Sequence, residues 1–152
     1  MFAKLDPTKI IHPGVRTQVR MACNVMSQDG VQYRRVVLRI PAAVAQKLGP
    51  RIDISVGLIG TPDEGMLRLT PGQAYSLWRE KARGSKDRCY TVSISVSRGL
   101  PRVRSMAVKH QVVGDAVIII VPREFRAHYE DLVRRVVAYL SDEAEEREVA
   151  NA

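Results

Sequence analysis

A run of β-forming residues that stops at a proline occurs three times in this chain, and a segment with helical features follows each proline. The first copy, RRVVLRIPAAVAQKLG, covers residues 34–49, the second, MLRLTPGQAYSLW, begins at Met66, and the third, VIIIVPREFRAHY, begins at Val117. Proline lacks an amide proton and has a φ preset for a helix, so it suits the first helical position. The sequence therefore predicts three strand–proline–helix joints, and the other elements can be placed around them.

Polar and apolar residues alternate in the segments between the joints, which is the period of a half-buried strand. Such runs cover residues 15–26, 31–40, 52–58, 90–97 and 102–113. The Asp29–Gly30 pair offers the positive-φ positions of a tight hairpin turn between the first two runs. Residues 98–101 form a further predicted turn, so 90–113 is interpreted as one long hairpin. The pattern indicates a β-rich α+β fold with antiparallel sheets or a barrel, short helices after the joints and a long C-terminal helix.

The second and third joints carry specific helix signals. At the second, Thr70 is a favourable cap and Gln73 stands at the capping-box position, which predicts a helix with Leu77 and Trp78 on its packed face. At the third, Pro122 opens a long helix whose apolar residues fall on one stripe. That stripe is predicted to be a core or dimer contact and consists of Phe125, Tyr129, Leu132, Val133, Val136 and Leu140.

The chain is long enough for one domain with its own core. Residues 1–14 show little periodicity, so they are expected to form an irregular N-terminal arm. Residues 15–141 are expected to form one compact domain, built either as a single unit or from two intertwined strand–helix repeats at 15–84 and 89–141. Residues 142–152 place glutamates at the negative end of the helix dipole, so this acidic tail is expected to fray.

The net charge of +8 is unevenly distributed along the chain. Residues 1–115 contain nineteen Lys and Arg against eight Asp and Glu, a net +11, whereas residues 116–152 contain five against eight, a net −3. A basic body attracts polyanions. The acidic end could screen that surface within the same chain or could simply keep the protein in solution.

The compartment is inferred from the apolar segments and the cysteines. No apolar run approaches the about eighteen residues that a membrane-spanning helix needs. The N-terminus has no apolar stretch of signal-peptide length, so the protein is expected to be cytoplasmic and to have no membrane partner. Cys23 and Cys89 lack CxxC spacing and are interpreted as reduced, buried thiols, with a disulfide between them as the alternative.

The sequence carries no recognisable signature of a catalytic or metal site. The HExxH, GxSxG, Walker and GxGxxG patterns are all missing from the sequence. His12, His110 and His128 are scattered and have no partner at ligand spacing. No catalytic residue, metal or cofactor is therefore predicted.

Exposed arginines on predicted strands are the strongest hint of a partner. Strands that carry such arginines can lie in a groove of duplex DNA and donate to phosphates and base edges. Aromatic residues are not interleaved with the basic positions, which argues against binding of single strands by base stacking. The predicted nucleic-acid-binding residues flank the first joint or lie in the 98–109 hairpin, and they are Arg34, Arg35, Arg39, Arg98, Arg102, Arg104 and Lys109.

The segment RRVVLRIPAAVAQKLGPRIDISVGLIGTPDEGMLRLTP resembles the swapped-hairpin regulators of the AbrB and MazE type and the related MraZ proteins. Their pattern is a strand ending in Ile-Pro, a short helix ending near Leu-Gly, and a two-stranded hairpin. AVIIIVPREFRAHY is similar to the strand and helix of a second copy, as in a one-chain pseudo-dimer. The resemblance implies that Arg34, Arg35 and Arg39 contact DNA. The chain departs from the pattern where Pro50-Arg51 replaces the usual Gly-Asp and where the second copy lacks its hairpin.

The sequence therefore predicts a non-enzymatic protein that binds double-stranded DNA, acts as a transcriptional regulator and forms a homodimer or larger homo-oligomer. The alternative is a protein-interaction or assembly module, such as a viral structural or inhibitory protein. In that alternative the exposed strands and the last helix make the contacts, and nucleic acid has no role.

Overall fold

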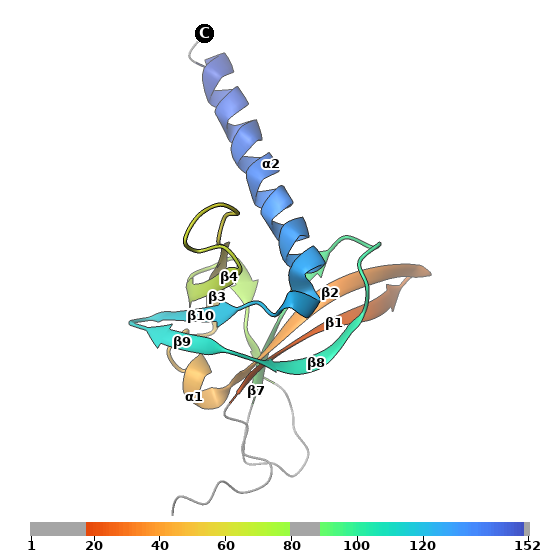
Figure 1. Cartoon of the computed structure of the whole chain (residues 1–152), viewed down its shortest axis with the longest axis vertical. Coiled ribbons are helices and arrows are strands. Elements are labelled where there is room, and N and C mark those ends of the chain that lie inside the picture. The colour runs from red at the N-terminus through yellow and green to blue at the C-terminus, as the bar shows by residue number, and fades with distance from the viewer. Residues whose placement is uncertain (1–17, 80–88, 151–152) are drawn as a thin grey trace, which may run out of the picture.

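The computed structural model describes residues 18–79 and 89–150. These residues form two five-stranded antiparallel sheets, short helical segments and a long C-terminal helix, so the predicted α+β class is confirmed (Figure 1). Sheet A has the strand order β6-β7-β2-β1-β8, and sheet B has the order β5-β3-β4-β10-β9. The predicted N-terminal arm, residues 1–14, and Gly84, the predicted end of the second helix, lie outside the described residues.

Each strand belongs to one of the two sheets. Sheet A consists of β1 (Val19–Gln28), β2 (Val31–Pro41), β6 (Trp78–Arg79), β7 (Cys89–Val96) and β8 (Val103–Val108). Sheet B consists of β3 (Arg51–Val56), β4 (Met66–Pro71), β5 (Tyr75–Ser76), β9 (His110–Val113) and β10 (Ala116–Ile120). The helical segments are α1 (Ala42–Ala45), the 3₁₀ helix η2 (Arg123–Phe125) and α2 (Arg126–Ala150).

Strands β1 and β2 form the predicted hairpin. Asp29 and Gly30 occupy its turn with φ of 52° and 77°, in the left-handed region that this pair adopts readily. Gln28 lies opposite Val31, which sets the register of the whole pairing. Because side chains alternate along a strand, one face of the hairpin is buried and the other is open. The buried face carries Val19, Met21, Cys23, Val36, Leu38 and Ile40.

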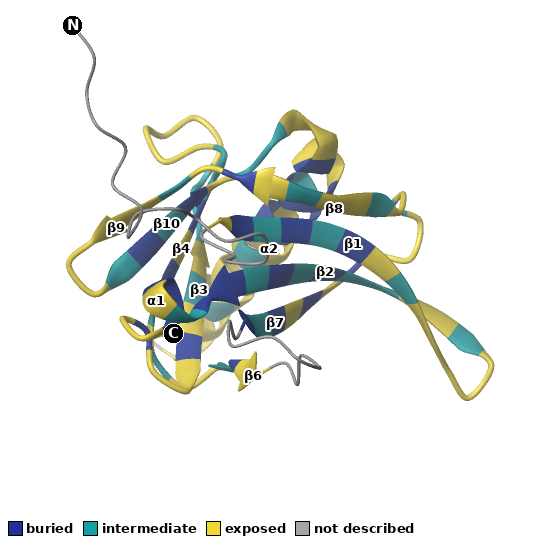
Figure 2. Cartoon of the chain, turned by 90° about the horizontal axis from the view of Figure 1, so that it is seen from below, coloured by how far each residue is buried: buried dark blue, intermediate teal, exposed yellow. Residues whose placement is uncertain are grey.

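One apolar core joins the inner faces of the two sheets and the first turns of α2 (Figure 2). Sheet B contributes Ile52, Leu67, Leu69, Val117 and Ile119, all fully buried. The C-terminal segment contributes Phe125, Tyr129, Leu132 and Val133. Burial of side chains of this size is the main source of stability in a chain with few aromatic residues.

The first and third joints begin a helical segment at the proline. Pro41 ends β2 and is the N-cap of α1, which covers four residues before the chain turns at Gly49 with a φ of 81°. So short a helix is not stable alone, and Val44 and Leu48 anchor it in the core. Pro122 precedes η2, which leads directly into α2.

The helix predicted at the second joint is wrong, because the chain continues in β4 and then in β5 and β6. One Asp53 carboxylate oxygen, on the neighbouring strand β3, accepts hydrogen bonds from the backbone amides of Gln73 and Ala74, each at 3.1 Å. The amide of Gly72 also donates to the Arg51 carbonyl at 3.1 Å. Residues of β3 therefore accept the hydrogen bonds of these three amides. A helix that began at Thr70 would have no free amide for the Thr70 side chain to cap.

This correction reverses the predicted environment of one side chain. Leu77 is buried, and its amide donates to the Pro50 carbonyl at 2.9 Å. Trp78, which the predicted helix would have packed, lies instead in the edge strand β6 with 69% of its surface exposed. Neighbouring residues of an extended chain point to opposite sides, so burying Leu77 turns Trp78 outward.

The long hairpin predicted at residues 90–113 is also wrong. Strands β7 and β8 do not pair with each other, since β2 and β1 lie between them in sheet A. The segment that connects β7 to β8 is instead bound by side chains of β2 and α2. Arg34 Nε donates to the Leu100 carbonyl at 3.0 Å, and His128 Nε2 donates to the Pro101 carbonyl at 2.8 Å. The strand predicted to follow is also divided, and only Lys109 separates β8 in sheet A from β9 in sheet B.

A buried carboxylate fixes α2 to the end of β7. Asp131 is 4% exposed and accepts hydrogen bonds from the Ser97 amide at 3.2 Å and from the Ser97 hydroxyl. Arg134 and Arg135 pair with it at 3.6 and 3.2 Å. Burial raises the pKa of Asp131, but the Ser97 bonds and the two guanidinium groups together outweigh burial, so the pKa lies below its ordinary value.

The second half of α2 stands away from the two sheets (Figure 1). In the predicted apolar stripe, Val136 is half-buried and Leu140 is 49% exposed, so Leu140 is not a core residue of the described chain. Its assignment as a dimer contact stays a prediction. Among the described residues, none of the helices has the length and apolar character needed to cross a membrane.

The helix also continues through residues 142–150, which were expected to fray. Glutamate and alanine make up most of this stretch, and both are good helix formers. The Tyr139 hydroxyl donates to a Glu143 carboxylate oxygen at 3.5 Å, one turn farther along. Helix propensity and such contacts between neighbouring turns oppose the unfavourable charge at the C-terminal end.

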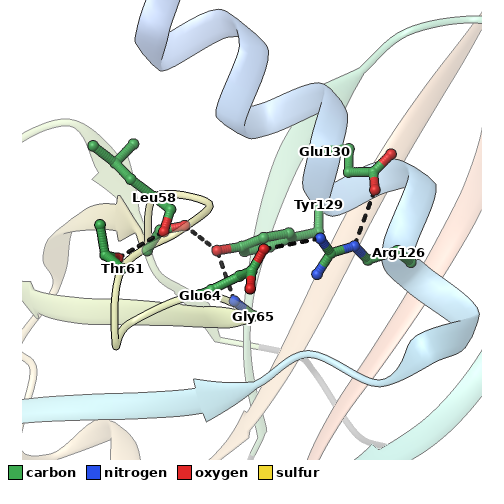
Figure 3. A network of polar contacts seen from close by, with 8 residues as sticks. Leu58, Thr61, Glu64, Gly65, Arg126, Tyr129 and Glu130 are labelled. Carbon is green, nitrogen blue, oxygen red and sulfur yellow. Dashed lines mark hydrogen bonds and ion pairs between the residues drawn. The ribbon is translucent and has the colours of Figure 1, made fainter.

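Tyr129 connects α2 to the loop between β3 and β4 (Figure 3). Its hydroxyl accepts a hydrogen bond from the Gly65 amide at 2.8 Å and donates to the Gly57 carbonyl. Beside it, Arg126 pairs with Glu64 at 3.2 Å and with Glu130 at 3.0 Å. Helix and loop are thus held by both hydrogen bonds and charge.

Substitution of Gly57 by alanine is expected to destabilise the protein by about 1–3 kcal/mol. A Cβ at this position would lie 1.7 Å from the backbone oxygen of Asp63, so the loop would have to move away from Tyr129. Thermal unfolding followed by circular dichroism measures the loss. Gly99→Ala is the matched control, because a Cβ there meets nothing within 4 Å. Equal losses at the two positions would contradict the packing described for the loop.

Candidate nucleic-acid interface

The open face of sheet A gathers arginines from strands that are far apart in the chain. In β1 and β2, the residues that alternate with the buried ones point away from the core. We call this side the outer face. It carries Arg20, Ala22, Asn24, Arg35, Val37, Arg39, Thr91, Ser93, Ser95, Ser105 and Ala107, as the strand registers pair them.

Arg20 and Arg39 are direct cross-strand neighbours on the outer face. Side chains in such a pair have Cβ atoms about 4.5–5.5 Å apart, and like charges at that distance destabilise a sheet. Arg20 is held in place, since its Nε donates to the Ser105 hydroxyl and its Nη2 to the Ser105 carbonyl, each at 3.0 Å. The strand pairing therefore places two arginines side by side, and the Arg20 guanidinium is directed toward β8.

A groove of about 210 Å³ lies over this pair. Arg102 and Arg104, both exposed, close it from the side of β8. Small and half-buried residues form its floor. The complete lining is Arg20, Ala22, Asn24, Val37, Arg39, Arg102, Val103, Arg104 and Ser105.

The strands of sheet A carry no acidic side chain. Residues 19–28, 31–41, 78–79, 89–96 and 103–108 include no aspartate or glutamate. In these strands an anion would meet guanidinium groups, hydroxyls and small apolar side chains. A planar guanidinium fork can bind the oxygens of a phosphate in a bidentate manner, and the groove is lined by four such groups.

The structure separates the seven predicted binding residues. Arg39, Arg102 and Arg104 line the groove, and Arg35 lies farther along the same face, between Asn24 and Ser95. The other three do not line the groove.

Arg34 shares the inner face with Val36, and its Nε donates to a loop carbonyl, so it does not belong to the groove. The Arg98 guanidinium lies over the Tyr33 ring at 5.3 Å from the ring centre. Lys109 lies at the point where the chain passes from one sheet to the other. Arg34 was misplaced because its neighbour Arg35 was treated together with it, although consecutive strand residues face opposite ways.

Arg20 was not predicted as a binding residue, although the sequence contains the signal. A two-residue turn at Asp29–Gly30 places Gln28 opposite Val31. Each step back along β1 is then matched by one step forward along β2, so the numbers of two facing residues always add up to 59. That register puts Arg20 opposite Arg39. The contribution of Arg20 could therefore have been derived from the turn alone.

The outer face also contains an exposed aromatic residue. Trp78 pairs with Thr91, Thr91 with Arg39, Arg39 with Arg20, and Arg20 with Ala107. Directly opposed residues of antiparallel strands have their side chains on the same face. We call these five residues the cross-strand row, and Trp78 stands at one of its ends.

Other reactive groups in the described chain are buried and separate. Cys23 and Cys89 are both buried and form no disulfide, and burial raises the pKa of the Cys23 thiol, an effect that nearby Arg34 reduces. His128 is fully buried beside Phe125. Within residues 18–79 and 89–150, no group of three or more metal-ligating side chains comes together.

Comparison of the chain with protein-family models, with curated proteins and with solved structures finds no match. The function must therefore be argued from the chemistry of the site.

Proposed function

We propose that this protein binds nucleic acid without covalent chemistry, and that the outer face of sheet A holds the phosphate backbone. One observation carries the proposal. Arg20 and Arg39 stand opposite each other beneath a groove that Arg102 and Arg104 complete, in a sheet whose strands contain no carboxylate.

The energetics of this arrangement favour a polyanionic partner. Four arginines line one groove, so a phosphate bound there would meet several guanidinium groups at once. Each phosphate that an arginine neutralises also releases condensed counterions, which drives binding at low salt. A single small anion would engage only part of a groove with four guanidinium groups, whereas successive phosphates of one strand would engage them together.

Double-stranded DNA and a role in transcription are the more specific form of the proposal. The resemblance of residues 34–70 to swapped-hairpin regulators supports that form, and so does the position of Arg35 and Arg39 on one face. Cytoplasmic residence is part of the same proposal. A phosphate backbone is common to duplex and single-stranded partners, so the groove supports either.

Self-association is the second part of the proposal. The projecting half of α2 exposes Val137, Tyr139 and Leu140 by 46%, 64% and 49%. Isolated helices of this length are marginal in water, and apolar residues on a free helix are typical of a surface that meets a partner. Homo-oligomers that persist at high salt without nucleic acid would favour an assembly role.

Fluorescence anisotropy of labelled oligonucleotides, titrated with the full chain at several salt concentrations, tests the function. We expect tight binding at low salt and a linear fall of log affinity with log salt concentration. The slope should correspond to about two to four phosphate contacts. Lack of binding to both duplex and single-stranded oligonucleotides at low salt would refute the proposal.

A further inference from the structure

Trp78 is the most exposed aromatic side chain in the described part of the protein, and it stands on the arginine-bearing face. Its exposed fraction is 69%, against 64% for Tyr139 on α2 and 37% for Tyr33. The register through Thr91 to Arg39 places the indole and the guanidinium groups on the same side of sheet A. A large apolar ring is thus kept in water beside a basic groove.

The local chain holds the indole outward. Leu77 is anchored in the core by burial, and its amide donates to the Pro50 carbonyl at 2.9 Å. On the other side, the Thr91 hydroxyl donates to the Trp78 carbonyl at 3.5 Å. The backbone of Trp78 is therefore fixed by β7 and by the core, and its side chain contributes little to folding through burial.

The spacing within the cross-strand row suits a nucleotide chain. Neighbouring strands lie about 4.8 Å apart, so the backbone of Trp78 is about 10 Å from that of Arg39 and about 14 Å from that of Arg20. A base stacked on the indole would then have phosphates within reach of the long arginine side chains. Aromatic platforms beside basic grooves are how single strands are bound, because every unpaired base presents a ring face.

We propose that the outer face of sheet A prefers single-stranded nucleic acid, with Trp78 stacking on an unpaired base while Arg39 and Arg20 hold the neighbouring phosphates. This inference rests on the proposed binding of nucleic acid by the outer face, and it names single strands as the ligand in place of the duplex DNA that the sequence resemblance favours. In a duplex the ring faces are stacked inside the helix and cannot meet the indole without unpairing. The preference for single strands over a duplex therefore comes from the indole. Phosphate contacts alone do not produce it, because both ligands have a phosphate backbone.

The inference revises an argument made from the sequence. In the sequence only Tyr33 adjoins the predicted basic positions, which argued against stacking. Trp78 is far from Arg20 and Arg39 in the sequence, and the strand pairing of β6, β7, β2 and β1 brings the three onto one face. Residues that are far apart along the chain can thus be neighbours on a sheet.

The single tryptophan of the chain makes the test direct. The full-length protein is titrated with an oligothymidylate of about 12 nucleotides and with a duplex of the same length, within the range of site sizes known for sheet-based binders. Anisotropy of the labelled oligonucleotide reports binding, and the intrinsic fluorescence reports stacking on Trp78. We expect saturable quenching of the tryptophan by the single strand, with tighter binding of the single strand than of the duplex.

Variants separate stacking from other effects. Trp78→Ala should weaken binding of the single strand by about 5- to 150-fold, the loss of one stacking contact. It should leave duplex binding unchanged. Trp78→Phe keeps a ring and should retain most of the affinity. Ile59→Ala removes another exposed apolar side chain, in the loop between β3 and β4, and should change neither affinity.

The outcomes distinguish the two proposals. Oligonucleotide binding by anisotropy without tryptophan quenching, and with wild-type affinity in Trp78→Ala, would overturn the stacking inference and leave nucleic-acid binding intact. A duplex bound more tightly than the single strand would do the same. Failure of both oligonucleotides to bind would overturn both proposals.

Discussion

Replacement of Arg20 and Arg39 together by glutamine is expected to weaken nucleic-acid binding by about 10- to 100-fold at low salt. Arg20 and Arg39 are direct cross-strand neighbours that line the groove, so their replacement removes two of its four guanidinium groups. The salt dependence should also become shallower, with a slope smaller by about two, because two phosphate contacts are lost. Anisotropy titrations at several salt concentrations measure both quantities.

Arg123→Gln is the matched control for charge. Its side chain is 95% exposed at the start of the C-terminal helical region, where Glu124 lies 3.7 Å away, and it is remote from the groove in sequence and outside sheet A. Arg20→Gln alone should cost about half of the binding free energy lost in the double variant. If Arg123→Gln weakened binding as much as Arg20→Gln, net charge would explain the affinity and the groove would have no special role.

Replacement of Asp131 by asparagine is expected to lower the free energy of unfolding by about 2–3 kcal/mol, or the melting temperature by about 4–12 °C. Asp131 is buried and accepts both the amide and the hydroxyl of Ser97. Hydrogen bonds to a charged acceptor are stronger than those to a neutral one. The loss should be smaller than for a fully buried ion pair, because Arg134 and Arg135 remain solvated by water.

The pH dependence of stability checks the same group independently. The pKa of Asp131 is lowered by folding, so its charged form stabilises the native state above the ordinary aspartate pKa of about 3.9. That contribution is lost as the pH falls through the lower, folded pKa. The stability difference between the wild type and Asp131→Asn should therefore be constant from neutral pH down to about pH 5 and should shrink below about pH 4.

Asp142→Asn provides the control, since Asp142 is exposed on the distal part of α2. It should leave the stability and its pH dependence almost unchanged. A difference between the wild type and Asp131→Asn that persisted undiminished to about pH 2 would show that the asparagine acts through packing and that charge is not involved.

Local chemistry made part of this fold predictable. The Asp29–Gly30 turn has few alternatives to a tight hairpin, and the alternation of apolar residues then assigns Val36 and Leu38 to the core. Prolines at 41 and 122 each precede a helical segment, as expected, because a preset φ acts wherever the surroundings allow it.

Contacts between residues that are far apart in the sequence determined the rest of the fold. The cap and capping-box signals at Thr70 and Gln73 were outweighed by the Asp53 carboxylate, twenty residues earlier in the chain, which binds the amides of Gln73 and Ala74. Such a partner leaves no local pattern in the sequence. The same holds for the loop after β7, whose carbonyls are bound by Arg34 and His128, so that β8 joins the opposite edge of sheet A.

The candidate site was predictable to the extent that it depends on β1 and β2. Arg39 was identified from its exposed position next to the first joint, and Arg20 follows from the register of the hairpin. Trp78 could not be found in this way, because its place depends on the edge strand β6 that the predicted helix concealed. Trp78 is the residue on which the proposed preference for single strands depends. The helix signals at the second joint predicted a packed position for it, whereas it is exposed in β6.

The central claim, that the outer face of sheet A is the nucleic-acid-binding surface, is tested most directly by mapping the contact residues. Backbone and indole resonances of the isotopically labelled full chain are followed by NMR during titration with an oligothymidylate. We predict that the largest shifts occur at Arg20, Ala22, Arg39 and the Trp78 indole, with little change in sheet B or in residues 134–150. Saturable shifts confined to sheet B or α2, with the outer face unaffected, would contradict the claim.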